Sequence, residues 1–202
     1  MEIKTIIFDL GNVLIGFDHS IAAKKLAKNS PYNEKDVYRL IFDSDLVSKY
    51  EKGKIKTVDF YKGMKRLLEF DLGLIQFLKV WNEIFFPKPD VERIVKKLKD
   101  RYRLILLSNI NAAHYSYIEK NFPIVRIFDR IVLSYRAGVR KPETKIYRLA
   151  IRQSRCQPSE IVYIDDRLDL VEAARRLNIN SIHFQTLGRF KKELLSYGIN
   201  SL

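Results

Sequence analysis

The stretch from Ile3 to Val13, which reads IKTIIFDLGNV, decides how the rest of the sequence is interpreted. Residues Ile3 to Phe8 are mostly apolar and β-branched with little alternation, a pattern typical of a strand that is buried on both faces. Asp9 follows directly, so a carboxylate stands where this strand ends. In an open parallel sheet, ligands bind at the carboxyl ends of the strands. We therefore expect Asp9 to belong to a functional site.

Similar short apolar runs recur along the chain, and helical patterns separate them. One helical pattern has apolar residues at the spacing i, i+3, i+4, i+7, beginning at Val91. Strands that alternate with helices of this length predict an α/β fold with a doubly wound parallel sheet of the Rossmann type. The further predicted strands are Leu104 to Leu107, Ile131 to Leu133, Ile161 to Ile164 and Ser181 to Phe184.

The segment between Gly16 and Phe86 breaks this alternation. It contains no convincing strand, whereas helical patterns repeat through it, the last of them from Leu74 to Phe85. Such a segment is best interpreted as an insertion after the first strand. We predict an α-helical cap at residues 16–87, inserted into a catalytic core of residues 1–15 and 88–202.

Composition limits the possible partners and cofactors. At 202 residues with 47% hydrophobic content, the chain is able to bury a sizeable core. No run approaches the ~18 apolar residues that cross a bilayer, so we expect a cytoplasmic protein without a membrane partner. Cys156 is the only cysteine, which excludes a disulfide framework. The net charge of +13 comes from scattered basic residues, a pattern typical of a solvated surface rather than of nucleic-acid binding. Both a monomer and a homodimer stay open.

Polar residues suited to phosphate binding stand at other predicted strand ends and helix starts. Ser108 and Asn109 follow one strand and offer a hydroxyl and an amide, while Lys141 precedes Pro142 at a predicted helix start. A phosphate bound at a helix start would attract the charge of Lys141. Each residue also has a structural interpretation, because Ser-Asn is an ordinary turn pair and a single Lys is commonly solvated.

Asp165 and Asp166 place two carboxylates side by side after the strand that ends at Ile164. Like charges this close raise each other's pKa unless a cation offsets them. Magnesium prefers a few carboxylates together with water and substrate phosphate, and Asp9 offers one more oxygen. The alternative is that one of the two Asp residues only caps the following helix. We predict a Mg²⁺ site.

Taken together, these residues resemble the four motifs of the haloacid dehalogenase superfamily, with GVRKPE at Gly138 to Glu143 similar to the third motif. The helical insertion resembles the small cap of the subgroup that contains the phosphatase domain of soluble epoxide hydrolase and a bacterial glucose-1-phosphate phosphatase. The resemblance implies a nucleophile that forms an aspartyl-phosphate, a metal site and two groups that hold phosphoryl oxygens. In this sequence they would be Asp9 as nucleophile, Asp9, the Gly11 carbonyl and Asp166 as metal ligands with Asp165 as an outer ligand, and Lys141 and Ser108 on the phosphate.

Gly11 departs from the family pattern, in which a second Asp protonates the leaving oxygen. General acid–base help of this kind is typically worth ~10²–10⁴ in rate. Either the substrate has a good leaving group, as in an anomeric sugar phosphate, or the chain is a catalytically weak ligand-binding or protein-binding member. Asp18 and His19 are candidate substitutes for the acid, although Asp18 also suits a helix cap and His19 a surface position.

The expected function is therefore a Mg²⁺-dependent phosphatase that acts on a small phosphorylated metabolite. The alternative within enzymes is a 2-haloacid dehalogenase, which would use the same nucleophile on carbon and would need no metal. The paired Asp165 and Asp166 favour the phosphatase, since a dehalogenase has no use for two adjacent metal ligands.

Overall fold

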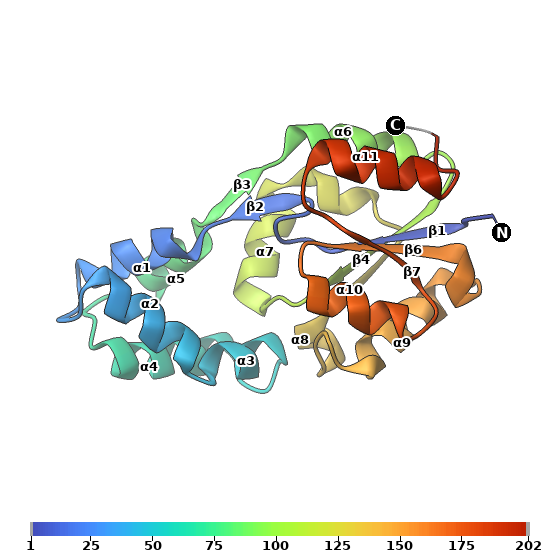
Figure 1. The fold of residues 1–202 in the computed structure, drawn as a ribbon. Coiled ribbons are helices and arrows are strands. Elements are labelled where there is room, and N and C mark those ends of the chain that lie inside the picture. The colour runs from blue at the N-terminus through green and yellow to red at the C-terminus, as the bar shows by residue number, and fades with distance from the viewer. Residues whose placement is uncertain (1, 201–202) are drawn as a thin grey trace.

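A five-stranded parallel sheet forms the centre of the computed structural model, which describes residues 2–200 (Figure 1). The strand order is β5-β4-β1-β6-β7, and every neighbouring pair is parallel. β1 is therefore central, an arrangement that opens a crevice at the carboxyl ends of β1 and its neighbours. The predicted doubly wound sheet is confirmed. The strands are β1 (Thr5–Phe8), β4 (Arg103–Ser108), β5 (Arg130–Leu133), β6 (Ile161–Asp165) and β7 (Asn180–His183).

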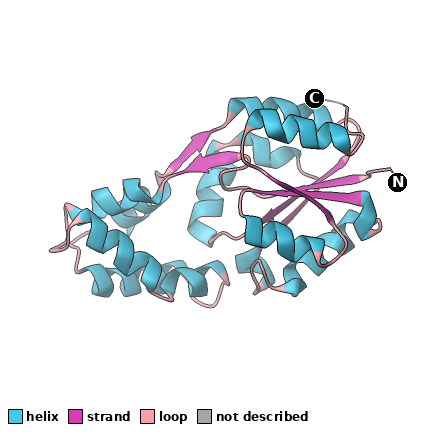
Figure 2. Cartoon of the chain, in the orientation of Figure 1, coloured by secondary structure: helices cyan, strands magenta, loops and turns pink. Residues whose placement is uncertain are grey.

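Helices cover both faces of this sheet (Figure 2). Because successive strand side chains point to opposite faces, Ile6 and Phe8 belong to one hydrophobic cluster and Ile7 to another. The first cluster also contains side chains of α6 (Pro89–Leu98), α7 (Ala112–Asn121) and α11 (Leu187–Ser196), and the second those of α9 (Thr144–Ser154) and α10 (Leu168–Arg175). The remaining short elements here are α8 (Ser134–Ala137), η1 (Pro123–Ile127) and η2 (Pro158–Glu160).

Five further helices form a separate part beside the sheet, drawn in blue to green in Figure 1. Their apolar side chains make a third cluster, in which the rings of Phe60 and Phe77 both contact Trp81. The division of the chain into a core and a cap stays a prediction. The helices are α1 (His19–Ala27), α2 (Glu34–Asp43), α3 (Leu46–Glu51), α4 (Thr57–Leu68) and α5 (Leu74–Asn82).

An antiparallel ribbon of β2 (Ile15–Phe17) and β3 (Phe85–Pro87) connects the helical part to the sheet (Figure 1). The prediction of no strand between Gly16 and Phe86 is wrong at both ends of that segment, and the predicted helix from Leu74 ends at Asn82 instead of Phe85. Within the ribbon the Phe86 ring lies over Gly16, where a Cβ atom would clash with the ring. Only glycine admits this contact.

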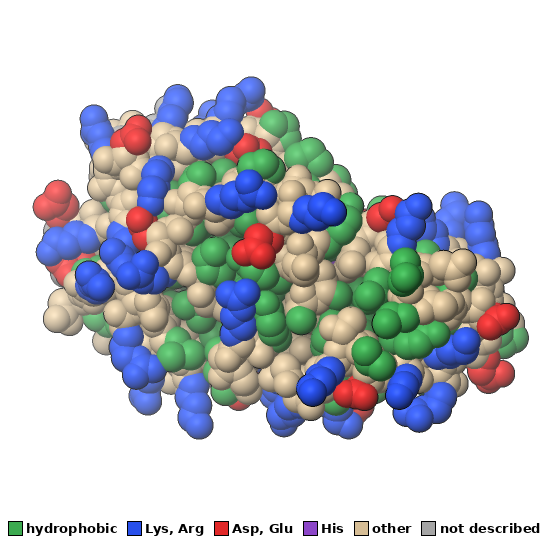
Figure 3. Space-filling view, turned by 180° about the vertical axis from the view of Figure 1, so that it is seen from behind, with side chains coloured by type: hydrophobic (Ala, Val, Ile, Leu, Met, Phe, Trp, Pro, Cys, Tyr) green, Lys and Arg blue, Asp and Glu red, His purple; other side chains and the backbone are tan. Residues whose placement is uncertain are grey.

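Basic side chains stand over most of the face shown in Figure 3, with acidic side chains among them, rather than gathered in one place. Within residues 2–200, no helix has the length and apolar character needed to cross a membrane.

Candidate active site

The carboxyl ends of three adjacent strands bring the predicted site residues together. Asp9 follows β1, Ser108 ends β4 and Asp165 ends β6, and the pairing of Phe8 with both Leu106 and Ile164 aligns these ends. Asp9 and Ser108 are buried, and both belong to one pocket of about 370 Å³. Asn109, Lys141 and Asp166 also line that pocket, so residues far apart in the sequence meet at the predicted edge.

Lys141 lies at the centre of the site and is 1% exposed. Its Nζ donates hydrogen bonds to Oδ1 of Asp9 at 2.7 Å and to Oδ2 of Asp165 at 2.6 Å. Burial opposes the charge of Lys141, but the two carboxylates outweigh burial and raise its pKa. Lys141 therefore stays cationic, which places a fixed positive charge beside the carboxylate of Asp9.

The loop before α9 positions Lys141 in a way that the sequence did not indicate. Helix α9 begins at Thr144 rather than at Pro142, so the prediction that Lys141 directly precedes a helix is wrong. The Asn109 amide holds the Lys141 backbone instead: its Oδ1 accepts from Lys141 N at 2.7 Å and its Nδ2 donates to Lys141 O at 2.9 Å. Both ends of this amide are thus engaged by protein, and substrate binding by Asn109 stays a prediction.

Asp165 is fully buried, and hydrogen bonds reach both of its oxygens. Oδ2 accepts from Lys141 and from the hydroxyl of Tyr163, while Oδ1 accepts from the backbone N–H of Arg167 at 2.9 Å. Asp165 therefore orients Lys141. This occupied hydrogen-bonding capacity makes it a poorer direct metal ligand than Asp9 or Asp166, in keeping with the expected outer position.

The three carboxylates fit a divalent cation. Asp9, Asp165 and Asp166 can each offer an oxygen such that these atoms lie within 4.8 Å of one another. Burial raises the pKa of Asp9 to about 7, with Asp165 adding to the effect and Lys141 opposing it. Burial and Asp165 also raise the pKa of Asp166. A bound cation would relieve this repulsion, and Asp9, Asp166 and the Gly11 carbonyl are the groups predicted to hold it.

Gly11 differs from an acidic residue by more than a missing carboxyl group. A Cβ atom built on Gly11 would lie 2.6 Å from Cε1 of Phe17, closer than real Cβ contacts. The Phe17 ring, carried by β2, therefore occupies the space into which a side chain at position 11 would extend. The local structure excludes an acid at this position as long as Phe17 keeps its place.

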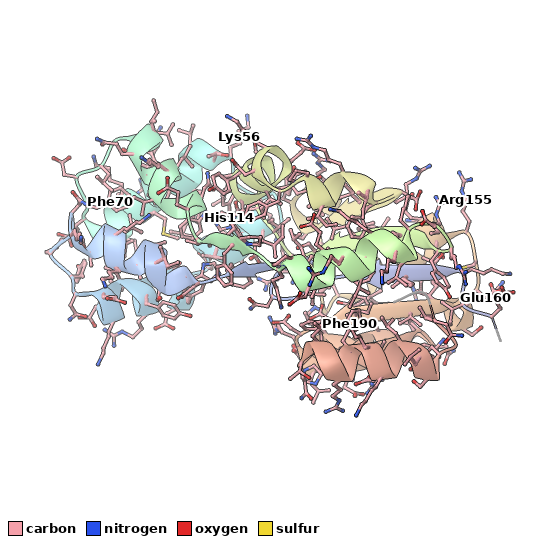
Figure 4. All side chains as sticks on the ribbon, turned by 90° about the horizontal axis from the view of Figure 1, so that it is seen from above. Lys56, Phe70, His114, Arg155, Glu160 and Phe190 are labelled. Atoms are coloured by element: carbon pink, nitrogen blue, oxygen red, sulfur yellow. The ribbon has the colours of Figure 1, made fainter. Side chains whose placement is uncertain are left out.

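The other side of the pocket is aromatic, and its residues come from the helical part, from β2 and from α7. Phe17, His19, Trp81 and His114 line an adjoining cavity of about 80 Å³. Figure 4 labels His114, which lies where the helical part meets the sheet. Its ring stacks on Trp81 at a centroid distance of 5.0 Å, and its Nε2 lies 3.0 Å from the Trp81 carbonyl. Phe42 also packs its ring 4.8 Å from that of His19.

Neither proposed substitute acid is supported. Asp18 caps α1 by accepting from the Ser20 backbone N–H, as its alternative interpretation held. His19 is not a surface residue: burial among aromatic rings lowers its pKa to about 4, so it is neutral near pH 7 and has no proton to donate as an acid. Asp169, in the first turn of α10, pairs with the exposed guanidinium of Arg167.

Sequence reasoning missed Glu51, Arg140 and Arg167, all of which line the pocket of Asp9. Glu51 ends α3 in the helical part, and its Oε2 lies 3.0 Å from Nη1 of Arg140. Arg140 and Arg167 stand next to Lys141 and Asp166 in the sequence, so adjacency to predicted residues was a usable signal for them. Glu51 belongs to the stretch Tyr50 to Ile55, which resembles a cap sequence of the family subgroup, but its position in the pocket depends on the fold that brings α3 to the strand ends.

The chain is similar to known proteins both in sequence and in fold. The chain is 24% identical to D-ribitol-5-phosphate phosphatase of Bacteroides thetaiotaomicron over 200 residues, 95% of this chain and 97% of the relative. It superposes with a TM-score of 0.81 and 26% identity on a HAD family enzyme of the same organism, solved with magnesium and inorganic phosphate, covering 91% of this chain and 94% of that one. A predicted HAD-like hydrolase of Porphyromonas gingivalis shares the fold, with a TM-score of 0.81 at 23% identity and coverage of 96% and 98%. The model of the haloacid dehalogenase-like hydrolases matches residues 3–178, and the chain belongs to this family.

Proposed function

We propose that this protein is a magnesium-dependent phosphatase that hydrolyses a phosphate monoester of a small metabolite through an aspartyl-phosphate on Asp9. The observation that carries this proposal is the position of Lys141, buried between Asp9 and Asp165 with Asp166 at the same edge. Phosphoryl transfer depends mainly on positioning and on neutralising the charge of the phosphoryl oxygens. This site offers a fixed cation, a buried carboxylate and a set of metal ligands within one pocket.

Each residue has a defined task in this proposal. The Oδ2 atom of Asp9 attacks phosphorus, because Oδ1 is held by Lys141. Lys141 and Ser108 bind phosphoryl oxygens, and the Asn109 clamp together with Asp165 keeps the ammonium group in place. Magnesium held by Asp9, Asp166 and the Gly11 carbonyl would neutralise charge on the phosphoryl group and on the nucleophile. Water then attacks the aspartyl-phosphate and releases inorganic phosphate.

The relatives support this substrate class. One is named for its action on D-ribitol 5-phosphate, and a glyceraldehyde 3-phosphate phosphatase of Methanothermobacter thermautotrophicus is 25% identical over 180 residues. Both named substrates are phosphorylated at a carbon chain that bears hydroxyl or carbonyl groups. We propose a sugar-like phosphate for this chain as well. Since Gly11 supplies no proton, either the leaving group is good, as at an anomeric carbon, or another residue supplies the proton.

Release of inorganic phosphate from a substrate panel tests the proposal. The panel contains p-nitrophenyl phosphate, hexose 1-phosphates, hexose 6-phosphates, ribitol 5-phosphate and acetyl phosphate, each with Mg²⁺ and with EDTA. We expect Mg²⁺-dependent turnover that Asp9→Asn abolishes, whereas Asp90→Asn, an exposed position on α6, retains it. Metal-independent chloride release from 2-chloropropionate would instead favour a dehalogenase, and absence of turnover by folded protein would contradict the proposal.

A further inference from the structure

The proposed reaction needs a proton at the leaving oxygen, and position 11 has no group that could supply it. The donor must be ionisable, must border the pocket of Asp9 and must hold a proton near neutral pH. His19 borders the pocket, but it is packed among Phe17, Phe42 and Trp81. The carboxylate next to it in the sequence, that of Asp18, accepts from Ser20 N. An imidazolium at His19 would have no partner among the described residues, so His19 does not meet the third requirement.

Glu51 meets the geometric requirements. It lines the pocket of Asp9 and Lys141, and it also lines the adjoining cavity together with Gly11 and Phe17. It therefore borders both spaces, as does Gly11, the position where the family pattern has an acid. Its side chain is 19% exposed, so a proton on it is shielded from bulk water.

One oxygen of Glu51 has no hydrogen-bond partner. The Oε2 atom is buried and lies 3.0 Å from Nη1 of Arg140, but that contact lacks the geometry of a hydrogen bond, and no other described residue supplies one. Apart from the ion pair with Arg140 this oxygen is unsatisfied, and protonation or contact with a substrate hydroxyl would complete its hydrogen bonding. This is the state expected of a group that exchanges a proton with a ligand.

We propose that Glu51 is the general acid and base of this active site and takes the place of the acid missing at Gly11. The proposal rests on the phosphatase function above. As Asp9 attacks phosphorus, the bond to the leaving oxygen breaks and that oxygen takes the proton of the Glu51 carboxyl, directly or through one water. The Glu51 carboxylate then accepts a proton from the water that attacks the aspartyl-phosphate, which restores the starting state.

The electrostatic surroundings are consistent with a carboxyl that can hold a proton. Burial raises the pKa of Glu51, although Arg140, Arg167 and Lys141 oppose this. A raised pKa favours the protonated carboxyl that a general acid needs. The other charged or titratable groups that border the same pocket are His19, Asp9, Asp165 and Asp166.

A proton donor on the helical part would make proton transfer depend on the position of that part over the sheet. Glu51 belongs to α3, whereas the nucleophile belongs to the sheet, so the proton donor is present only when α3 lies against the loop of Arg140. A donor on the helical part would be assembled together with the substrate pocket. Under this account, the chain accepts alkyl phosphates and is not restricted to substrates with good leaving groups.

A series of substituted phenyl phosphates tests this role, because their leaving groups differ in basicity while their size changes little. For Glu51→Gln we expect kcat/KM to fall ~10²–10⁴-fold on the most basic leaving group and less than ~10-fold on p-nitrophenyl phosphate. The decline of kcat/KM at high pH should also disappear, because it reports loss of the Glu51 proton. Glu51→Asp, which keeps a carboxyl, should recover part of the activity on basic leaving groups.

Two control variants separate proton transfer from a merely structural contact. Arg140→Met breaks the ion pair but leaves the carboxyl in place, so the wild-type dependence on leaving group should remain, with the high-pH decline moved upward. Glu143→Gln breaks the neighbouring contact of Lys52 with Glu143, 3.1 Å in the structure, and should behave as wild type. Equal losses of Glu51→Gln on every leaving group, matched by Arg140→Met, would overturn the inference.

The role of Glu51 and the phosphatase function of the chain can be tested separately. If the wild type hydrolyses p-nitrophenyl phosphate and Asp9→Asn does not, the phosphatase function holds whatever Glu51→Gln shows. If His19→Gln, and not Glu51→Gln, changes the dependence on leaving group, the acid is assigned wrongly. No turnover in the wild type would overturn both.

Discussion

The sheet side and the helical side of the pocket differ in how their polar groups are paired. On the sheet side, Lys141 has charged partners at 2.7 and 2.6 Å, and both oxygens of Asp165 accept hydrogen bonds. On the helical side, aromatic rings predominate, and His19, Glu51 and Trp81 each leave a buried polar atom without a hydrogen bond. The first side is preorganised for one group, the phosphoryl group, which all substrates of such an enzyme share. The second has polar atoms still available to the part of the substrate that varies.

The largest effect is expected from removing the cation of the sheet side. Lys141→Met leaves Asp9 and Asp165 buried without their common partner, and breaking a buried pair in this way costs about 3–5 kcal/mol. Urea unfolding measures the change in the free energy of unfolding. Lys145→Met, at an exposed position in α9, is the matched control and should change stability by less than about 0.5 kcal/mol. If Lys141→Met lowered the free energy of unfolding by less than about 1 kcal/mol, Lys141 would not be the cation that stabilises the two buried carboxylates.

The second prediction concerns His114 of α7, whose ring stacks on Trp81 of the helical side. Its Nε2–H donates to the Trp81 carbonyl and its Nδ1 accepts from Asn111 Nδ2, so the neutral ring is satisfied. Burial lowers the pKa of His114 from 6.5 to about 3. Below pH 6.5 the unfolded state therefore binds a proton that the folded state rejects. The contribution of His114 to the free energy of unfolding is therefore at its full value above pH 6.5. It falls toward pH 3 by up to about 1.4 kcal/mol per pH unit.

Unfolding measured between pH 7 and pH 4 checks this direction. His114→Gln should flatten the curve relative to wild type, and His19→Gln should flatten it less, because the pKa of His19 is lowered only to about 4. Parallel curves for the wild type and His114→Gln would contradict a neutral His114.

The smallest effect is expected where the two sides meet, at Gly11 and Phe17. Gly11→Ala puts a Cβ atom 2.6 Å from the Phe17 ring and should cost about 1 kcal/mol, since overpacking costs ~1–3 kcal/mol. In a Phe17→Ala background the cost should vanish, which a double-mutant cycle measures as coupling. Gly188→Ala in α11, where a Cβ meets nothing within 4 Å, should not be destabilising. Additive effects at Gly11 and Phe17 would mean that the ring does not occupy this space.

The sequence predicted the sheet side of the pocket better than the helical side. Strand patterns and the residues that end them were sufficient for the sheet, for Asp9 and for the Asp165-Asp166 pair, because parallel strands bring their carboxyl ends to one edge. The role of Asn109 as a clamp on Lys141 was not predictable, because it depends on the path of the loop before α9.

The helical side was much harder to predict. The ribbon of β2 and β3 is too short for periodicity to detect, and it depends on Phe86 lying over Gly16. Glu51 and His19 reach the pocket only through the packing of helices against the sheet, and residue spacing within a helix does not contain that information. The expectation of a surface position for His19 was wrong for this reason.

The central claim is that Asp9 becomes phosphorylated during turnover, and acid quenching tests it most directly. Protein mixed with Mg²⁺ and p-nitrophenyl phosphate is quenched within the first turnovers, and its peptides are examined by mass spectrometry. The account predicts one phosphoryl group on the peptide with Asp9, located at Asp9 itself and absent from Asp9→Asn. Turnover without any phosphorylated protein, or a phosphoryl group on another residue, would contradict it.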